Sequence, residues 1–219
     1  MLGFSVHDGA PHLSYPIGKS RDNGAGRRRV AFQPDGEISA LRVQCNERKP
    51  MSPLILTPVP LSIAAFAPFG AVLEADGTNG VSVNSGWAWQ FDQAPAFAHT
   101  TGQAWPSTAI YRNRPRDLPI DLQELERHPF SCQLFMPMGA SRWLVAVAPD
   151  DAAGRPDVVL AQAFLASGRQ GICYRPGVWH SPLLGLDEET DFFMLMWSRN
   201  PSDDTEVHLL DRLVQIRLE

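Results

Sequence analysis

From about residue 54 onward, short apolar runs recur along the chain and are separated by proline and glycine. Such runs predict β-strands, and many short strands at this spacing favour a closed antiparallel barrel or jelly roll. The predicted strands are 54–57, 70–74, 107–111, 132–136, 143–148, 171–174 and 191–197. The pattern at 209–218 fits either a strand or a helix, and both remain open.

Few segments show the spacing of apolar residues that is typical of a helix, so we predict an all-β fold with only one or two short helices. Ser62 is a good N-cap for a helix over 62–69, because the apolar residues Ile63, Phe66 and Phe69 follow it. A second, distorted helix is predicted around 157–165.

The first 53 residues differ from the rest in amino-acid composition. They contain scattered glycine, proline, arginine and asparagine, and few apolar runs. Two short strands are conceivable at 30–32 and 38–43, but a lone hairpin is marginal in water. We predict a mostly disordered extension over 1–53, followed by one domain over 54–219. Met51, just before this domain, is a second candidate for the initiating residue.

Composition narrows the function classes for this chain of 219 residues. The net charge is −5, which argues against a nucleic-acid binder, and the basic run at 27–29 fits a solvated tail. Three cysteines without a CxxC pair argue against a disulfide framework or a cysteine-built zinc site. With no signal peptide or membrane span expected, the predicted location is cytoplasmic.

Two polar segments within the strand pattern carry candidate chemistry. Glu126 and His128 are two apart, so an extended strand places their side chains on the same face. A bend near Pro129 would return Gln133 to that face. His180 follows the turn at 176–177. Together these residues predict a polar cluster in a barrel mouth, which is a common type of small-molecule site.

The same residues also fit purely structural roles, and these alternatives remain open. His180 flanked by Trp179 and Ser181 also fits a histidine of the core, and Glu126 to His128 fits a surface turn with a local ion pair. A protein-interaction module is a further class, and it would show a large exposed apolar patch instead of a polar pocket.

The two segments resemble the two sequence motifs of cupins. The first reads Glu126-x-His128 and then Gln133, and the second is a shortened form running from Pro176 to His180. The resemblance implies a cupin-type double-stranded β-helix. It also implies a divalent metal held by Glu126, His128, Gln133 and His180. Nickel, manganese or no metal at all would be compatible with these residues.

Over residues 54–210 the chain more closely resembles the ureidoglycolate lyase family. The resemblance rests on 66–74, 125–137 and 174–180. It implies an enzyme that cleaves ureidoglycolate to glyoxylate and urea in purine and allantoin degradation. A homodimer is expected as well, because barrels of this size often pair through an edge strand.

The resemblance and the chemistry of the side chains together suggest roles. His128 and His180 would transfer protons or bind the metal, since a histidine pKa lies near neutrality. Glu126 would act as base, ligand or orienting group. The expected substrate-binding residues are Arg112, Gln133, Arg199 and Tyr174, with Arg175 as a weaker candidate for the carboxylate. The alternative for Arg112 is an ordinary surface arginine.

Four positions depart from the family pattern. They are Gln90, Tyr111, Ser181 and Ser198. These departures motivate a second function class, in which a divergent cupin binds or acts on another small hydroxy acid or a sugar, or binds without catalysis.

Overall fold

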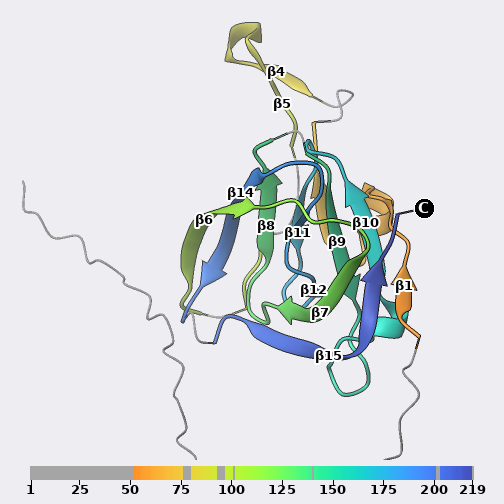
Figure 1. Ribbon diagram of the computed structural model, residues 1–219. Helices are drawn as coiled ribbons and strands as arrows, with labels where there is room; N and C mark the ends of the chain where they lie inside the picture. Colours follow the sequence, from red (N-terminus) through yellow and green to blue (C-terminus); the bar gives the residue numbers. More distant parts are fainter. Residues whose placement is uncertain are drawn as a thin grey trace, which may run out of the picture. The chain divides into compact units, whose positions relative to one another are not determined.

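Two curled β-sheets face each other across the main hydrophobic core (Figure 1). The larger sheet has the strand order β1-β15-β7-β12-β9-β10-β2, with β13 also paired to β9, and the smaller has the order β3-β11-β8-β14-β6. A separate two-stranded hairpin is formed by β4 and β5. The predicted all-β jelly roll is therefore confirmed.

The computed structural model describes residues 52–75, 80–92, 97–100, 102–139, 141–200 and 203–218. The predictions for the first 51 residues, including the disordered extension, its two short strands and the initiating residue, lie outside this range.

The larger sheet contains β1 (Leu54–Leu56), β2 (Val59–Pro60), β7 (Ile120–Arg127), β9 (Trp143–Ala148), β10 (Gln162–Ala166), β12 (Trp179–His180), β13 (Leu184–Gly185) and β15 (Glu206–Ile216). The smaller sheet contains β3 (Gly70–Leu73), β6 (Trp105–Asn113), β8 (Gln133–Pro137), β11 (Gly171–Tyr174) and β14 (Thr190–Ser198). The hairpin strands are β4 (Val81–Val83) and β5 (Ala88–Gln90), and the short helical elements are α1 (Ile63–Phe66), η1 (Asn84–Gly86) and η2 (Val158–Leu160).

The core has two main layers, and strand β9 contributes to both. Its alternate residues Trp143, Val145 and Val147 join the cluster between the sheets. Leu144 and Ala146 join a second cluster that contains residues of β1, β7, β10 and β15, so the larger sheet curls around it. Strand β14 instead buries alternate residues, as expected for a strand with one face on the core.

Helix α1 begins where the sequence predicts. The Ser62 hydroxyl accepts a hydrogen bond from the Ala65 amide at 3.2 Å, which confirms the N-cap. The helix is shorter than predicted and ends at Phe66. Pro68 accounts for the early end, because it has no amide hydrogen to donate to the Ala64 carbonyl and so cannot continue the helix.

The prediction of a second helix over 157–165 was wrong. A 3₁₀ turn, η2, is capped by Asp157, and the chain then continues as strand β10, which pairs antiparallel with β9. Phe164 and Ala166 are buried in the main core from this strand. Tertiary pairing thus overrides the helical preference of the alanine- and leucine-rich segment. Segment 209–218, for which both a strand and a helix were considered, lies mainly in strand β15. The pairing of this strand with β7 has a register shift between Leu209 and Val214.

Gly70 has a structural reason to be glycine within segment 66–74, which carries part of the family resemblance. Strands β3 and β11 approach so closely that a Cβ at Gly70 would lie 2.1 Å from the Cys173 carbonyl oxygen. Only glycine fits at this position, and it allows Phe69 beside it to reach the core.

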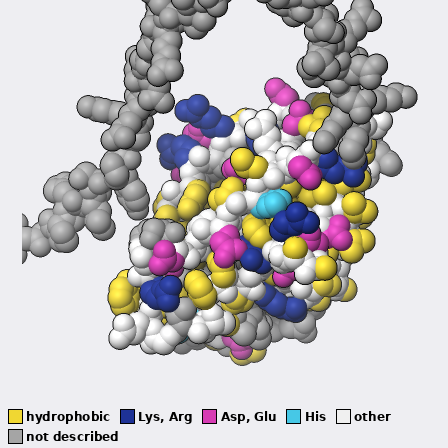
Figure 2. Space-filling model, turned by 90° about the horizontal axis from the view of Figure 1, so that it is seen from below, with side chains coloured by type: hydrophobic (Ala, Val, Ile, Leu, Met, Phe, Trp, Pro, Cys, Tyr) yellow, Lys and Arg dark blue, Asp and Glu magenta, His cyan; other side chains and the backbone are white. Residues whose placement is uncertain are grey.

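The surface of the described residues carries mixed charge. Figure 2 shows acidic and basic side chains interspersed with apolar ones on the face seen from below. Among the described helices, none has the length and apolar character to cross a membrane. Strand β6 is the last strand of its sheet, with Trp105 and Ile110 exposed. The homodimer stays a prediction.

We expect Phe66→Ala to lower the free energy of unfolding by about 3–5 kcal/mol, because its fully buried ring packs on Phe69, Phe164 and Tyr174. Urea denaturation measures this change. Ile63→Ala is the matched control in the same helix, since Ile63 is 58% exposed, and it should shift stability by no more than about 0.5 kcal/mol. Equal losses in both variants would contradict this account of the core.

Candidate functional site

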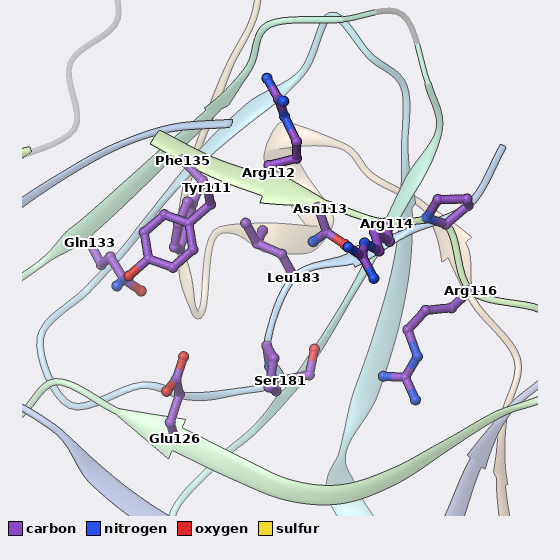
Figure 3. A pocket seen from close by; sticks show the side chains of 12 residues that line it. Tyr111, Arg112, Asn113, Arg114, Arg116, Glu126, Gln133, Phe135, Ser181 and Leu183 are labelled. Carbon is purple, nitrogen blue, oxygen red and sulfur yellow. The ribbon is translucent and has the colours of Figure 1, made fainter. Parts of the chain in front are cut away.

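A pocket of about 630 Å³ is lined by polar and apolar side chains of both sheets and the segments that follow them (Figure 3). Glu126, Gln133 and Ser181 lie on one part of its wall, and Arg114 and Arg116 point toward it from another part (Figure 3). The remaining lining residues are Tyr111, Arg112, Asn113, Pro115, Phe135, Pro182 and Leu183.

Strand pairing brings Glu126 and His180 together. They are direct partners in the antiparallel pair of β7 and β12. Side chains of directly opposed residues in such a pair are close neighbours, and His180 Nε2 lies 3.7 Å from Glu126 Oε1. His128 follows the end of β7, and its ring centroid lies 5.4 Å from that of His180. The structure thus brings together three of the four residues that were predicted to form one cluster.

Backbone carbonyls fix both imidazole rings. His180 Nδ1 lies 2.8 Å from the Val178 carbonyl oxygen, and His128 Nδ1 lies 2.9 Å from the Asp204 carbonyl oxygen. A carbonyl only accepts, so each Nδ1 must carry the proton and donate it. In the neutral ring, each Nε2 is then left with a lone pair.

These lone pairs face a carboxylate. Suitable ligand atoms of Glu126, His128 and His180 all lie within 4.8 Å of one another. Both Nε2 atoms are buried and have no hydrogen-bond partner among the described residues. Three electron-rich groups thus meet with no donor between them, which is unfavourable unless a cation, a proton or a donor from a ligand fills the gap.

Burial controls the protonation of the cluster. Burial, together with the nearby His128, lowers the pKa of His180 to about 3, so this ring is neutral near pH 7. Burial also raises the pKa of Glu126, although the charge of His128 opposes this. Tyr174 stacks on His180 with ring centroids 4.0 Å apart, and burial raises its pKa far above its usual value. The tyrosine therefore stays a neutral phenol that packs against the imidazole.

Gln133 lies at the site, but not because of the predicted bend near Pro129 within one strand. The chain leaves the larger sheet after β7, turns at 129–130, and enters the smaller sheet at Gln133. The side chain thus comes from the facing sheet and lines the pocket with Glu126 (Figure 3). Its Oε1 is buried without a partner among the described residues, so it is available to a ligand.

The predicted arginines lie in different surroundings. Arg112 lines the pocket, but its guanidinium makes two hydrogen bonds to Asp191, at 2.8 and 2.9 Å, and extends away from the centre (Figure 3). Arg199 lies over the Phe130 ring at 5.1 Å. Arg175 donates to the carbonyls of Ala67 and Pro68 just after helix α1. Neither Arg199 nor Arg175 is among the residues that line the pocket.

Arg114 and Arg116 also line the pocket, although neither was predicted from the sequence. Within the described chain, neither guanidinium has a hydrogen bond or an ion pair. The sequence does contain a signal for them, because arginine occurs at every second position over 112–116. In an extended chain, this spacing places the side chains on one side.

The four positions that depart from the family pattern have local partners. Ser181 lines the pocket, and its hydroxyl accepts from the Ala146 amide at 3.1 Å. Tyr111 packs edge-on against Phe135. Ser198 donates to Asp204, and Gln90 donates to Asp92.

Comparisons with known proteins identify the family of this chain. The family model described as ureidoglycolate lyase matches residues 53–217. A ureidoglycolate lyase of Rhizobium leguminosarum bv. trifolii is 42% identical over 137 residues, which are 62% of this chain and 80% of that protein. One of Burkholderia mallei is 39% identical over 136 residues, 62% of this chain and 78% of that protein.

Among solved structures, an rmlC epimerase of Mycobacterium tuberculosis matches with a TM-score of 0.40 and 12% identity, over 66% of this chain and 70% of that one. That likeness is too weak to support any argument. The family match spans most of the sequence and includes both polar segments of the pocket. The chain therefore belongs to the ureidoglycolate lyase family.

Proposed function

We propose that this protein cleaves ureidoglycolate to glyoxylate and urea, as a step of purine and allantoin degradation. The observation that carries the proposal is the convergence of Glu126, His128 and His180 at a pocket where the Arg114 and Arg116 guanidinium groups have no partner among the described residues. Membership of the family supports the choice of substrate. The relatives named above carry the same activity in their names.

The reaction is an elimination that consumes no water. A base removes the hydroxyl proton of the carbinolamine carbon, and that oxygen becomes the aldehyde of glyoxylate as the C–N bond breaks. The departing nitrogen takes up one proton and leaves as urea. The site must therefore accept one proton and return one, which suits a group whose pKa has moved toward neutrality.

Glu126 is our candidate for the proton transfers. Its carboxylate lines the pocket, whereas the two imidazoles are buried behind it. Because burial raises its pKa, the carboxylate is a better base than an exposed one. Gln133 would donate or accept a hydrogen bond to the substrate through its amide, whose Oε1 has no partner among the described residues.

The same cluster fits a divalent metal ion. One carboxylate and two imidazoles, with Gln133 as a weaker fourth ligand, suit nickel or manganese. A bound ion would supply Lewis acidity to substrate oxygens. Tyr174 and the carbonyls of Val178 and Asp204 hold the imidazole rings for either role.

The substrate carboxylate needs a cation, and we assign it to Arg114 and Arg116. Arg112 is already bound by Asp191, with Glu189 at 3.6 Å, so it would have to break an existing ion pair. A free guanidinium binds a carboxylate through its planar fork without that cost. This assignment replaces our expectation that Arg112 captures the carboxylate.

Glu126→Gln should lower kcat for glyoxylate release by about 10²- to 10⁴-fold, because it removes the group that transfers the proton. His180→Ala should do the same by disrupting the cluster. A coupled assay of glyoxylate, with urea measured in parallel, gives both rates. His208→Ala is the control, since His208 packs against Trp179 and belongs to strand β15 outside the cluster. Near-normal turnover in Glu126→Gln would rule out proton transfer by Glu126.

The same assay separates the two function classes. If the wild-type protein releases no glyoxylate from ureidoglycolate but turns over another hydroxy acid, the divergent function is favoured instead.

Metal-free protein should bind one Ni²⁺ or Mn²⁺ ion, and His128→Ala should weaken this binding by at least about tenfold. Isothermal titration calorimetry measures the affinity. His208→Ala again serves as the control and should bind the ion like the wild type. If the wild type and His128→Ala bind these ions equally weakly, the cluster is not a metal site.

Arg114→Met and Arg116→Met should raise KM about tenfold or more, since a hydrogen bond to a charged group contributes about 1.5–3 kcal/mol. Steady-state kinetics with ureidoglycolate separate KM from kcat. Arg155→Met is the control, because Arg155 forms its ion pair with Asp151 outside this pocket. A large rise in KM for Arg112→Met alone would return the carboxylate to Arg112.

A further inference from the structure

We propose that Asp204 is a positioning residue, which fixes the tautomer and orientation of the His128 ring from a remote segment of the chain. The positioning rests on hydrogen bonds described above. Its consequence for metal binding and turnover rests on the proposed function.

The Asp204 carboxylate organises the backbone that follows strand β14. It is 7% exposed and accepts hydrogen bonds from the Ser198 hydroxyl at 2.5 Å and from the Arg199 and Asn200 amides at 3.2 and 3.3 Å. The Asp204 amide in turn donates to the Asn200 carbonyl at 3.1 Å. A buried carboxylate with several donors is firmly held, and removing its charge leaves those donors poorly paired.

This arrangement aims the Asp204 carbonyl at the site. The carbonyl oxygen lies 2.9 Å from His128 Nδ1, and the Thr205 hydroxyl lies 3.2 Å from the same nitrogen. The contact selects the ring form with the proton on Nδ1, so Nε2 keeps the lone pair that faces Glu126 and His180. If the Asp204 carbonyl moved away, the Nδ1–H tautomer of His128 would lose the hydrogen bond that favours it. The ring could then adopt the Nε2–H tautomer, in which Nε2 has no lone pair to offer as a ligand.

The two histidines differ in how they are held. His180 donates to Val178, two residues earlier in its own turn. His128 instead depends on a carbonyl 76 residues further along the chain. Substitutions that remove the Asp204 carboxylate or its Ser198 donor should therefore disturb His128 and leave the tautomer of His180 unchanged. A general loss of structure would not give this pattern.

The test uses ¹⁵N-histidine-labelled, metal-free full-length protein and long-range ¹H–¹⁵N spectra. His128→Gln and His180→Gln assign the two rings. We expect both rings as the Nδ1–H form in the wild type, and His128 alone to shift toward the Nε2–H form in Asp204→Asn. The Ni²⁺ affinity of this variant should fall by about 10- to 100-fold. Asp203→Asn, at the neighbouring exposed aspartate, should match the wild type in both measurements.

An unchanged His128 tautomer with unchanged Ni²⁺ affinity in Asp204→Asn would overturn the proposal. If that variant does not fold, Ser198→Ala removes one donor to the same carboxylate and should give a smaller shift in the same direction; no shift there would also overturn it. A wild type that shows the expected tautomers but releases no glyoxylate would reject the proposed function and leave the positioning of His128 intact.

Discussion

Two buried imidazole Nε2 atoms, which have no hydrogen-bond partner among the described residues, are held beside the half-buried carboxylate of Glu126. This arrangement opposes folding, because each unpaired polar atom has lost its hydration. The two core layers and the strand pairing around the site must offset that cost. The structure thus keeps an unsatisfied arrangement in place, which is what a site built to receive a cation or a substrate requires.

Backbone contacts, more than side-chain contacts, set the position of these groups. The register of β7 against β12 places Glu126 opposite His180. The Gly177 amide, in the turn that leads to His180, donates to the His128 carbonyl at 2.8 Å. Gly177 has a positive φ of 81°, which suits glycine, so the Pro-Gly turn has a role in the site beyond reversing the chain.

The parts of the site that follow from local rules were predictable from the sequence. The two-residue spacing gave the shared face of Glu126 and His128, and the turn at 176–177 gave the start of the strand at His180. Gln133 was predicted in the site by an incorrect route, because its position depends on a crossing between sheets. Arg114 and Arg116 were missed because only the folded pocket distinguishes them from Arg112, whose partner Asp191 lies on strand β14.

Strand β9 connects the candidate site to the second of the two core layers. Its residue Val147 pairs with His180, and the neighbouring Ala146 is bonded through both its amide and its carbonyl to Ser181 in the pocket wall. Ala146 also packs in the core layer on the other face of the sheet. Sequence change in that layer is therefore constrained by the geometry of the candidate site, and the two regions are expected to evolve together.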